Sequence, residues 1–484
     1  MPASEMSPGA AARTSGVSPP AAAGSLTRER WLGYFLAPAL VASTNAICAG
    51  YINVFYTDVL NMSVIAGGLF LSLMPMISKI VDAVTNIIMG QFIDRTTSRQ
   101  GKARPWLLIS GPVLAVSAIL LFLVPENNIT LQVIWVTVSY NLYYSVSYTV
   151  YNISNTLMTP LATRNSKQRD TLAMAYSMGF NMVPGMLCSI LFPIILLPYM
   201  GVDRSRWIQV MFFMALLSIP AAIVQYYFSR ERITEETTAA EGKKNAEVSL
   251  GAQLRGCLRS RYWRIIIGVA LVYWLYQNFQ VTSTTYYCNW VLGSYNDGRT
   301  IPIVNAIGQA PLGLGVVLLW PLVKKFGKRN IMIAGGFLAV AGGFLCTLNP
   351  RSISMVLLGL VLRSFGMLPV VYILLAMLAD TLDHVEYING FRCDGFSASV
   401  YSIITTVSYG VSLGVFNLFL GKLGYAAPAL GAALPVQNEA IQNFFIAGFF
   451  VVPVAAAVII MVLLLFYDLE KKLPEMQQAI THRK

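Results

Sequence analysis

A row of polar residues with helical spacing interrupts the second long apolar stretch of the sequence. These residues lie three or four positions apart and are Lys79, Asp82, Asn86, Gly90 and Asp94. At about 100° per residue, this spacing puts them on one stripe of a helix. Lys79 and Asp82 can form an ion pair, which would lower the cost of burying both charges. Asp82 and Asn86 can present side-chain oxygens toward one point, an arrangement that suits a hard cation such as Na⁺.

Such a stripe is costly in a membrane. A charged side chain at the bilayer centre costs about 2.5–3.5 kcal/mol on insertion scales, and such residues usually face a cavity or a partner. The stripe therefore predicts a site for cation coupling or substrate gating. The alternative is a structural Lys79–Asp82 pair that locks two helices together.

A second charge, Arg363, lies near the middle of the tenth apolar stretch, "VLLGLVLRSFGMLPVVY". A guanidinium offers several fixed hydrogen-bond donors, so it would anchor an anionic or hydroxyl-rich substrate. The alternative is a buried cation that pairs with a structural carboxylate.

Three further stretches carry neutral polar and aromatic residues on one helix face. These residues are Asn141, Ser145, Tyr148, Asn152 and Asn155, then Tyr273, Gln277, Gln280 and Thr284, then Asn305 and Gln309. Polar residues also join helices in membranes. However, amides, hydroxyls and aromatic rings are what a sugar site needs, because sugar hydroxyls take hydrogen bonds and sugar C–H faces stack on rings. We expect Lys79, Tyr148, Asn152, Gln277 and Arg363 to bind the substrate.

The composition is that of an integral membrane protein. Of 484 residues, 56% are apolar and only 12% are charged, with a mean hydropathy of +0.61. A soluble protein would have about a quarter of its residues charged. The apolar runs are roughly 20 residues or longer, which is too long for barrel strands and predicts an all-α protein surrounded by membrane lipid. The net charge of +12 is interpreted as membrane topology, and no nucleic-acid partner is expected.

About twelve spans are predicted, in two sets of six. The first set is 31–58, 64–93, 106–124, 130–159, 171–199 and 206–228; the second is 263–291, 300–323, 331–349, 353–380, 394–423 and 440–467. The expected organisation is a disordered cytoplasmic tail (1–30), a six-helix bundle (31–228), a cytoplasmic middle loop (229–262), a second six-helix bundle (263–467) and a cytoplasmic tail (468–484).

Lys and Arg concentrate in every second loop, which predicts a multi-pass protein of the cell membrane, plasma or inner, with both termini in the cytoplasm. The loops "IDRTTSRQGKARPW" and "VKKFGKRN" each place a basic turn after the second helix of a half. Two such halves with a long middle loop are typical of a secondary carrier whose site lies between them.

Enzymatic motifs are absent from the sequence. It has no phosphate-binding G-x-x-x-x-G-K-[ST] loop, no G-x-S-x-G elbow and no H-E-x-x-H. There are two histidines and six scattered cysteines without a C-x-x-C. We therefore expect no enzyme, no catalytic residue, no metal site and no cofactor.

Three motifs carry a resemblance to a known family. "DAVTNIIMGQFIDRTTSRQGKARPW", "YTDVLNMS" (Tyr56–Ser63) and "ADTLDHVEYINGFRCDG" (Ala379–Gly395) resemble those of the glycoside–pentoside–hexuronide:cation symporters. This melibiose-carrier family lies within the major facilitator superfamily, and the similarity covers about residues 31–467. It implies a major-facilitator fold of two six-helix bundles.

The resemblance also implies roles for single residues. Asp82 matches the family's first acidic cation-binding position, Asn86 stands where a second Asp is usual, and Thr149 matches a hydroxyl near the cation. These three are the expected coupling site for Na⁺ or H⁺. Asn152 and Ser177 stand in the places of a sugar-binding Asp and Arg, and Thr406 in that of a Lys. These differences leave the coupling cation and galactoside specificity open.

The basic loop after the stripe is expected to form a cytoplasmic gate with acidic residues of the second half. The expected gate residues are Asp94, Arg95, Arg99, Lys102, Arg104, Asp380, Asp383 and Arg392. They would pair across the cytoplasmic mouth in one state and separate in another.

The sequence thus predicts a secondary active transporter, a cation:sugar or cation:glycoside symporter working by alternating access. Three alternatives stay open: a carrier of an anionic or amphiphilic solute such as a hexuronide or lysolipid, an uncoupled facilitator, and a membrane receptor that transports nothing.

Overall fold

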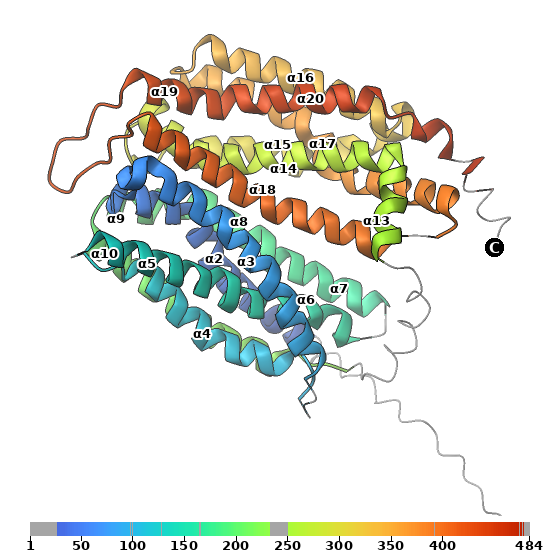
Figure 1. The fold of residues 1–484 in the computed structure, drawn as a ribbon, viewed down its shortest axis with the longest axis horizontal. Coiled ribbons are helices and arrows are strands. Elements are labelled where there is room, and N and C mark those ends of the chain that lie inside the picture. The colour runs from blue at the N-terminus through green and yellow to red at the C-terminus, as the bar shows by residue number, and fades with distance from the viewer. Residues whose placement is uncertain are drawn as a thin grey trace, which may run out of the picture.

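Long helices lying side by side form two adjacent groups, one coloured blue to green and the other yellow to red in Figure 1. The structure is a computed structural model, and it describes residues 27–96, 98, 100–126, 128–163, 166–232, 250–391, 393–473, 475–476 and 478. All regular elements within these ranges are helical. An all-helical architecture is what a lipid-embedded backbone requires, because each helix satisfies its own hydrogen bonds.

The first group runs from Glu29 to Phe228. Its segments are η1 (Glu29–Leu36), α2 (Ala37–Val54), η2 (Phe55–Val59), η3 (Met62–Gly68), α3 (Leu69–Asp94), α4 (Arg104–Phe122), α5 (Ile129–Asn141), η4 (Leu142–Tyr148), α6 (Thr149–Ala162), α7 (Ser166–Ser177), η5 (Met178–Met182), α8 (Val183–Met186), η6 (Leu187–Leu196), α9 (Leu197–Met200), α10 (Arg204–Leu216) and α11 (Ser218–Phe228). Several adjoining segments continue one helix, with π-helical turns between α-helical ones.

The second group begins after the middle loop. Its segments are α13 (Leu250–Arg259), α14 (Arg261–Tyr287), η9 (Cys288–Leu292), α15 (Thr300–Phe326), α16 (Lys328–Leu348), α17 (Ile353–Asn389), α18 (Asp394–Lys422), α19 (Glu439–Ile446), η10 (Ala447–Val451), α20 (Val452–Leu465) and η11 (Leu469–Lys471).

The expected spans are all helical. Within the described residues, 10 helices are long and apolar enough to cross a membrane. The two other expected spans correspond to the run Ile129–Ala162 and to α15. The polar side chains of α6 lower the hydropathy of the first of these. The chain therefore crosses the membrane many times.

The ends of the expected segments differ slightly from the structure. Residues 27–30, expected in the tail, are already helical, and much of the expected middle loop after position 249 is α13 and the start of α14. The helix α13 is amphipathic, but it lies in the most polar part of the chain, where composition alone predicts a loop. Residues 1–26 and 233–249 lie outside the described residues.

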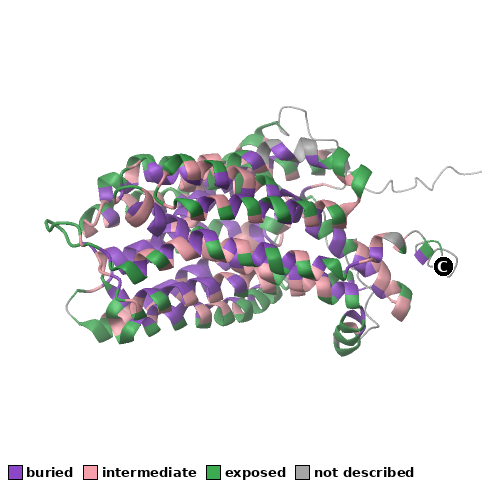
Figure 2. Cartoon of the chain, turned by 90° about the horizontal axis from the view of Figure 1, so that it is seen from above, coloured by how far each residue is buried: buried purple, intermediate pink, exposed green. Residues whose placement is uncertain are grey.

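The outward sides of the helices are apolar. On α3, Ile80 and Ile87 are 67% and 66% exposed, whereas Asp82 is 5% exposed. Figure 2 shows this contrast along the helices, with exposed residues on their outer sides and buried ones toward the interior. An apolar exterior around a polar interior is the pattern of helices in lipid.

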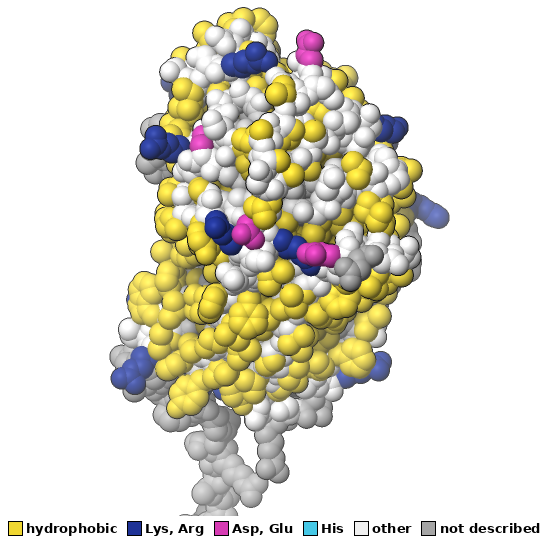
Figure 3. Space-filling view, turned by 90° about the vertical axis from the view of Figure 1, so that its left-hand side faces the viewer, with side chains coloured by type: hydrophobic (Ala, Val, Ile, Leu, Met, Phe, Trp, Pro, Cys, Tyr) yellow, Lys and Arg dark blue, Asp and Glu magenta, His cyan; other side chains and the backbone are white. Residues whose placement is uncertain are grey.

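Two ends of the molecule are useful landmarks. The termini face carries Glu29, Arg104, Lys328 and Lys472, and the opposite face carries Asp58, Asp297 and Gln437. Figure 3 looks onto the opposite face, where a few charged side chains lie among apolar and uncharged ones.

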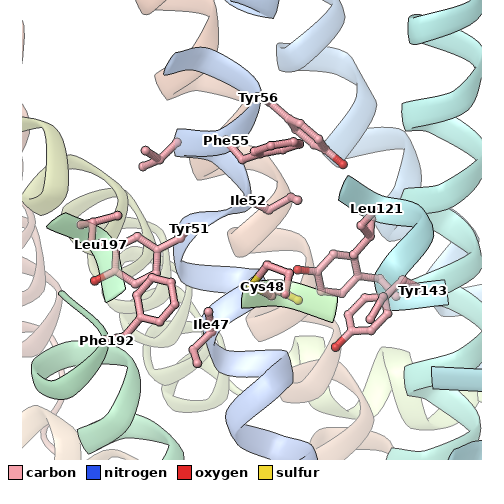
Figure 4. Packing of buried hydrophobic residues seen from close by; sticks show 14 of the residues in the cluster. Ile47, Cys48, Tyr51, Ile52, Phe55, Tyr56, Leu121, Tyr143, Phe192 and Leu197 are labelled. Atoms are coloured by element: carbon pink, nitrogen blue, oxygen red, sulfur yellow. The ribbon is translucent and has the colours of Figure 1, made fainter. Parts of the chain in front are cut away.

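Aromatic packing holds the first helix in place. Ile47, Cys48 and Phe55 belong to a buried cluster that also contains Tyr143 and Phe192 (Figure 4). The ring centroids of Tyr51 and Phe192 are 4.7 Å apart. Because lipid is as apolar as these side chains, close packing rather than hydrophobic burial stabilises such contacts.

Small residues bring the two groups together along α3 and α18. A Cβ atom on Gly414 would lie 2.5 Å from the carbonyl oxygen of Ser72, and one on Gly421 would lie 2.4 Å from the Cα atom of Gly68. The backbones can approach this closely only where side chains are missing. This contact continues to Gly410, where a Cβ would lie 2.7 Å from Cγ of Lys79. Lys79 thus lies at the boundary between the groups.

Candidate functional site

The predicted Lys79–Asp82 pair is present. Nζ of Lys79 lies 2.5 Å from Oδ2 of Asp82, and the hydroxyl of Ser145 donates a hydrogen bond to Oδ1. Asp82 is 5% exposed, and the side chain of Lys79 is 13% exposed. A buried ion pair of this kind is costly to break, because the remaining charge would be uncompensated.

Aromatic rings complete the surroundings of the Lys79 ammonium. Nζ lies 5.6 Å from the ring centroid of Tyr144 in η4 and 5.2 Å from that of Tyr409 in α18. Both distances are in the range of cation–π attraction. The ammonium is therefore held by residues of both helix groups, so a change at Asp82 would be felt across their boundary.

The other expected coupling residues do not bond to the Asp82 carboxylate. Nδ2 of Asn86 donates to the backbone oxygen of Asp82 at 2.7 Å, and the Thr149 hydroxyl donates to the backbone oxygen of Tyr144 at 3.2 Å. Ser145 supplies the hydroxyl at the carboxylate instead. It belongs to the polar face predicted for the fourth span, but the sequence could not show which residue of that face meets α3.

A cavity of about 150 Å³ lies mainly between α14, α15 and α17. Its polar lining includes Gln277, Gln280, Asn305, Gln309, Ser364 and Arg363. The first group contributes Gly50 and Tyr51 from α2 and Cys188 and Ser189 from η6. Two separately predicted polar faces, those of the seventh and eighth spans, therefore meet Arg363 of the tenth span in one place, at the boundary between the groups.

Gln277 and Arg363 line this cavity, whereas three other expected substrate residues do not. Lys79 is held at Asp82, and the ring of Tyr148 stacks on Tyr143 with centroids 6.4 Å apart. Asn152 lies half-buried on α6. In the fourth span Ser145 meets Asp82, whereas Asn155 accepts from Gln225 of α11. Residues of the seventh, eighth and tenth spans form the cavity.

A smaller cavity of about 30 Å³ lies between the two places. It shares Gly50, Val281 and Thr285 with the larger cavity, and Tyr409 is also in its lining. Because Tyr409 also contacts Lys79, a continuous set of side chains connects the ion pair to the larger cavity.

Arg363 is buried without a carboxylate partner. It is 3% exposed, its Nη1 donates to the backbone oxygen of Phe449 at 2.6 Å, and its carbon Cζ lies 5.0 Å from the Phe449 ring centroid. No acidic side chain of the described residues forms an ion pair with it.

The expected gate residues at the termini face pair within their own helix groups where the structure shows their contacts. Nζ of Lys328 lies 2.5 Å from Asp380, and Nη2 of Arg104 donates to the backbone oxygen of Tyr226 at 2.8 Å. Arg95, Lys102 and Asp383 lie at the same face. The remaining expected members, Arg99, Arg392 and the side chain of Asp94, lie outside the described residues.

A buried carboxylate that we did not assign lies at the opposite face. Asp58 is 2% exposed and accepts hydrogen bonds from Thr57 (2.7 Å), Tyr295 (2.9 Å) and Tyr425 (2.9 Å). Both tyrosines belong to the second helix group. The motif "YTDVLNMS" contains Asp58, but nothing in the motif showed that it reaches the other half.

The matching family model is described as "MFS/sugar transport protein", and it covers residues 33–471. The chain belongs to this family.

Within the described residues, no group of three or more His, Cys, Asp or Glu side chains gathers as a metal site would require.

Similar proteins agree with this assignment over most of the chain. The isoprimeverose transporter of Lactiplantibacillus pentosus is 27% identical over 434 residues, covering 89% of this chain and 86% of that protein. The glucuronide carrier protein homolog of Escherichia coli (strain K12) is 24% identical and covers 94% of this chain and 95% of its own. A putative sulfoquinovose importer of the same organism is 24% identical over 92% of both chains.

The fold agrees as well. A bacterial homolog of the human lysosomal transporter Spinster, solved in an inward-facing and unoccupied conformation, superimposes with a TM-score of 0.60 at 14% identity. The match covers 94% of this chain and 98% of that one. This member of the MFS/sugar transport family is thus a multi-pass secondary transporter with the major-facilitator fold, and it is not an enzyme.

Proposed function

We propose that the chain is a cation-coupled symporter for a sugar or glycoside and works by alternating access. The observation that carries the proposal is the buried Asp82 carboxylate, held by Lys79 and Ser145 at the boundary of the two helix groups. A carboxylate in this place binds an entering cation or proton, and the amide-lined cavity supplies hydrogen bonds for hydroxyls.

The ion pair suggests how coupling works. A cation or proton that neutralises Asp82 removes the partner of the Lys79 ammonium. Lys79 then loses its main attraction within α3, while its contact with Tyr409 in α18 remains. The packing of α3 against α18 therefore changes with the occupancy of Asp82, and Tyr409 passes this change to the cavity.

The electrical driving force is sufficient for accumulation. One charge entering per cycle gains about 2.3 kcal/mol per 100 mV. Because about 1.4 kcal/mol corresponds to a factor of ten, this sustains roughly fifty-fold accumulation of a neutral solute.

We also assign orientation and substrate class. By the positive-inside rule, the basic turns support an orientation in which the termini face meets the cytoplasm and the protein spans the cell membrane. The hydrogen bonds from Tyr295 and Tyr425 to Asp58 close the opposite, external face in this conformation. A sugar or glycoside agrees with the substrates named for the isoprimeverose transporter and the glucuronide carrier homolog.

A second candidate is an uncoupled facilitator. It is favoured by Asn86, whose amide is turned onto the backbone of its own helix. It is also favoured by Lys79, because the ammonium already occupies the Asp82 carboxylate. In this case the pair would be structural, and substrate would move only down its own gradient.

Uptake into proteoliposomes separates the two candidates. Labelled glycosides, pentosides and hexuronides are offered with and without an inward Na⁺ or H⁺ gradient. For a symporter, a gradient raises uptake several-fold, and Asp82→Asn abolishes that increase while solute counterflow continues. Asp170→Asn, which changes an exposed carboxylate on α7, serves as the matched control. Uptake that responds to neither gradient, or a gradient response that survives in Asp82→Asn, would reject the coupling role of Asp82.

A further inference from the structure

Arg363 keeps a full positive charge in the interior of the second helix group. A guanidinium stays protonated in proteins and carries five N–H donors. A buried charge is costly unless it is paired, and here the described residues supply no carboxylate. Its Nη2 atom has no hydrogen-bond partner among them. The side chain therefore has both charge and a donor left to offer.

Among the described residues, Phe449 positions the Arg363 guanidinium without neutralising it. Phe449 lies in the π-helical segment η10, four residues before Pro453, which has no N–H to donate. Its carbonyl accepts from Nη1, and its ring covers the guanidinium at 5.0 Å. A neutral carbonyl and an aromatic ring fix the orientation of the guanidinium but do not neutralise its positive charge.

The cavity beside Arg363 offers donors without negative charge. Gln277, Gln280, Asn305 and Gln309 supply amides to the lining, and the part of it formed by described residues has no Asp or Glu. A guanidinium with amides around it matches the oxygens of a carboxylate or sulfonate, since such pairs form short, charge-assisted and often two-pronged hydrogen bonds. The remaining amides suit hydroxyl groups.

The size of the cavity limits what the anion is attached to. In this conformation a cavity of about 150 Å³ suits a small polyol or a single sugar ring.

We propose that Arg363 and the surrounding amides form an anion subsite that binds the carboxylate or sulfonate of a monosaccharide-sized sugar acid. This rests on the proposed function as a sugar carrier, and it names the substrate class. The positive charge makes acidic sugars better ligands than their neutral counterparts. The Lys79–Asp82 pair lies outside this subsite, so anion selectivity and cation coupling are separable.

The test measures equilibrium binding to the purified full-length protein, where no gradient is involved. Three probes differ only at C6 of the same methyl hexoside: the neutral alcohol, the carboxylate and the sulfonate. Wild-type protein is expected to bind at least one acid ten-fold or more tightly than the neutral sugar. The two acids also distinguish a carboxylate site from a sulfonate site.

Arg363→Gln is expected to lose the preference for the acid, whereas Arg351→Gln, a change just before α17 on the exposed surface, keeps it. If Arg363→Gln does not give a monodisperse protein, Arg363→Lys decides: it keeps the preference but binds the acid several-fold more weakly. The proposal is overturned if wild-type protein prefers the neutral sugar or binds none of the probes. It is also overturned if the Arg363 variants keep both the preference for the acid and the wild-type affinity for it.

Parallel uptake measurements keep the two proposals distinguishable. Acid binding without a response to any cation gradient would reject symport and leave the anion subsite standing. Gradient-driven uptake of the neutral sugar, unchanged in Arg363→Gln, would reject the subsite and leave symport standing.

Discussion

The Tyr425 hydroxyl donates a hydrogen bond to Oδ1 of Asp58 at 2.9 Å, and this contact joins the first helix of the chain to the segment that follows α18. Tyr295 donates to the other carboxylate oxygen at the same distance. The Trp290 indole in turn donates to the Tyr425 hydroxyl at 3.0 Å. A carboxylate of one helix group thus holds two hydroxyls of the other at the opposite face.

Tyr425→Phe should weaken closure of this face. In the closed state the change removes one donor from a buried carboxylate, whereas in the open state water replaces that donor. A hydrogen bond to a charged acceptor contributes about 1.5–3 kcal/mol, so the open population should rise by about ten-fold or more. Val281 lines both cavities, so its accessibility reports on the opening of this face. The measurement is the rate at which an impermeant maleimide, applied from the opposite face, labels the new cysteine in Val281→Cys.

Tyr199→Phe is the matched control, because Tyr199 is 51% exposed at the same face. It should leave the labelling rate unchanged. A rate in Tyr425→Phe equal to that of the control would show that the Asp58 contacts do not hold the face closed.

Asn86→Asp should strengthen coupling to Na⁺. The change adds a second carboxylate one helical turn from Asp82, and two carboxylates attract a hard cation better than one. The added negative charge also competes for the Lys79 ammonium. We expect the Na⁺ concentration for half-maximal uptake to fall by about ten-fold, measured in proteoliposomes at fixed pH.

Thr85→Asp provides the control for charge alone, because Thr85 lies on α3 beside Asn86 and its hydroxyl bonds to its own helix backbone. If the Na⁺ concentration for half-maximal uptake fell equally in both variants, the position of the added carboxylate on α3 would not matter for Na⁺ binding. No response in either would favour the uncoupled facilitator.

The two basic turns share one capping arrangement, in which a glutamate accepts from backbone amides. Glu231 accepts from the backbone amides of Lys102, Ala103 and Arg104 at 2.8 Å each, at the start of α4. Glu470 accepts from the amides of Lys328 (2.6 Å) and Arg329 (3.2 Å), at the start of α16. In each half, a carboxylate that follows the last helix thus satisfies the free amides at the start of the third helix.

Glu231→Gln should therefore destabilise the fold. Hydrogen bonds to a charged acceptor contribute about 1.5–3 kcal/mol, and an amide oxygen retains part of this. We expect a loss of about 1–2 kcal/mol, seen as a lower thermal unfolding temperature of the purified protein, while substrate affinity is unchanged. Glu439→Gln, an exposed glutamate at the start of α19, should shift the temperature far less. Equal shifts in both would contradict the capping role.

The sequence was enough to predict features that depend only on neighbouring residues within one helix. The spacing of Lys79 and Asp82 was enough to predict their pairing, because residues three positions apart meet on any helix. Apolar length was enough to predict the spans, because the bilayer sets that length. Both inferences need only the local chain.

Contacts between helices could not be predicted in the same way. Periodicity gives a polar face but not the helix that it meets, so Ser145 and Tyr409 were not recognised as neighbours of Asp82 and Lys79. The partner of Arg363 is the backbone oxygen of Phe449, and side-chain patterns do not reveal backbone acceptors. The same holds for Asp58, whose two tyrosine partners lie more than two hundred residues away in the sequence.

Acid stability offers a test at the termini face. The Tyr262 hydroxyl (2.7 Å) and the Lys472 ammonium (2.9 Å) lower the pKa of Asp468 below its ordinary value, with a further contribution from Arg261. A carboxyl whose folded pKa is depressed adds stability above its unfolded pKa of about 3.9, and this stability is lost as the pH falls further. Asp468→Asn should therefore unfold at a lower temperature than wild type at pH 6, and the difference should shrink below about pH 4.

The effect is expected to be small, because the Asp468 side chain is 39% exposed and water screens its ion pairs. Glu475→Gln, at an exposed carboxylate nearby, should match wild type at both pH values. The sign of the pH dependence decides the matter: a difference between Asp468→Asn and wild type that grows on acidification would mean that the carboxyl is favoured in its protonated form, and that the hydrogen bonds from Tyr262 and Lys472 do not stabilise its charge.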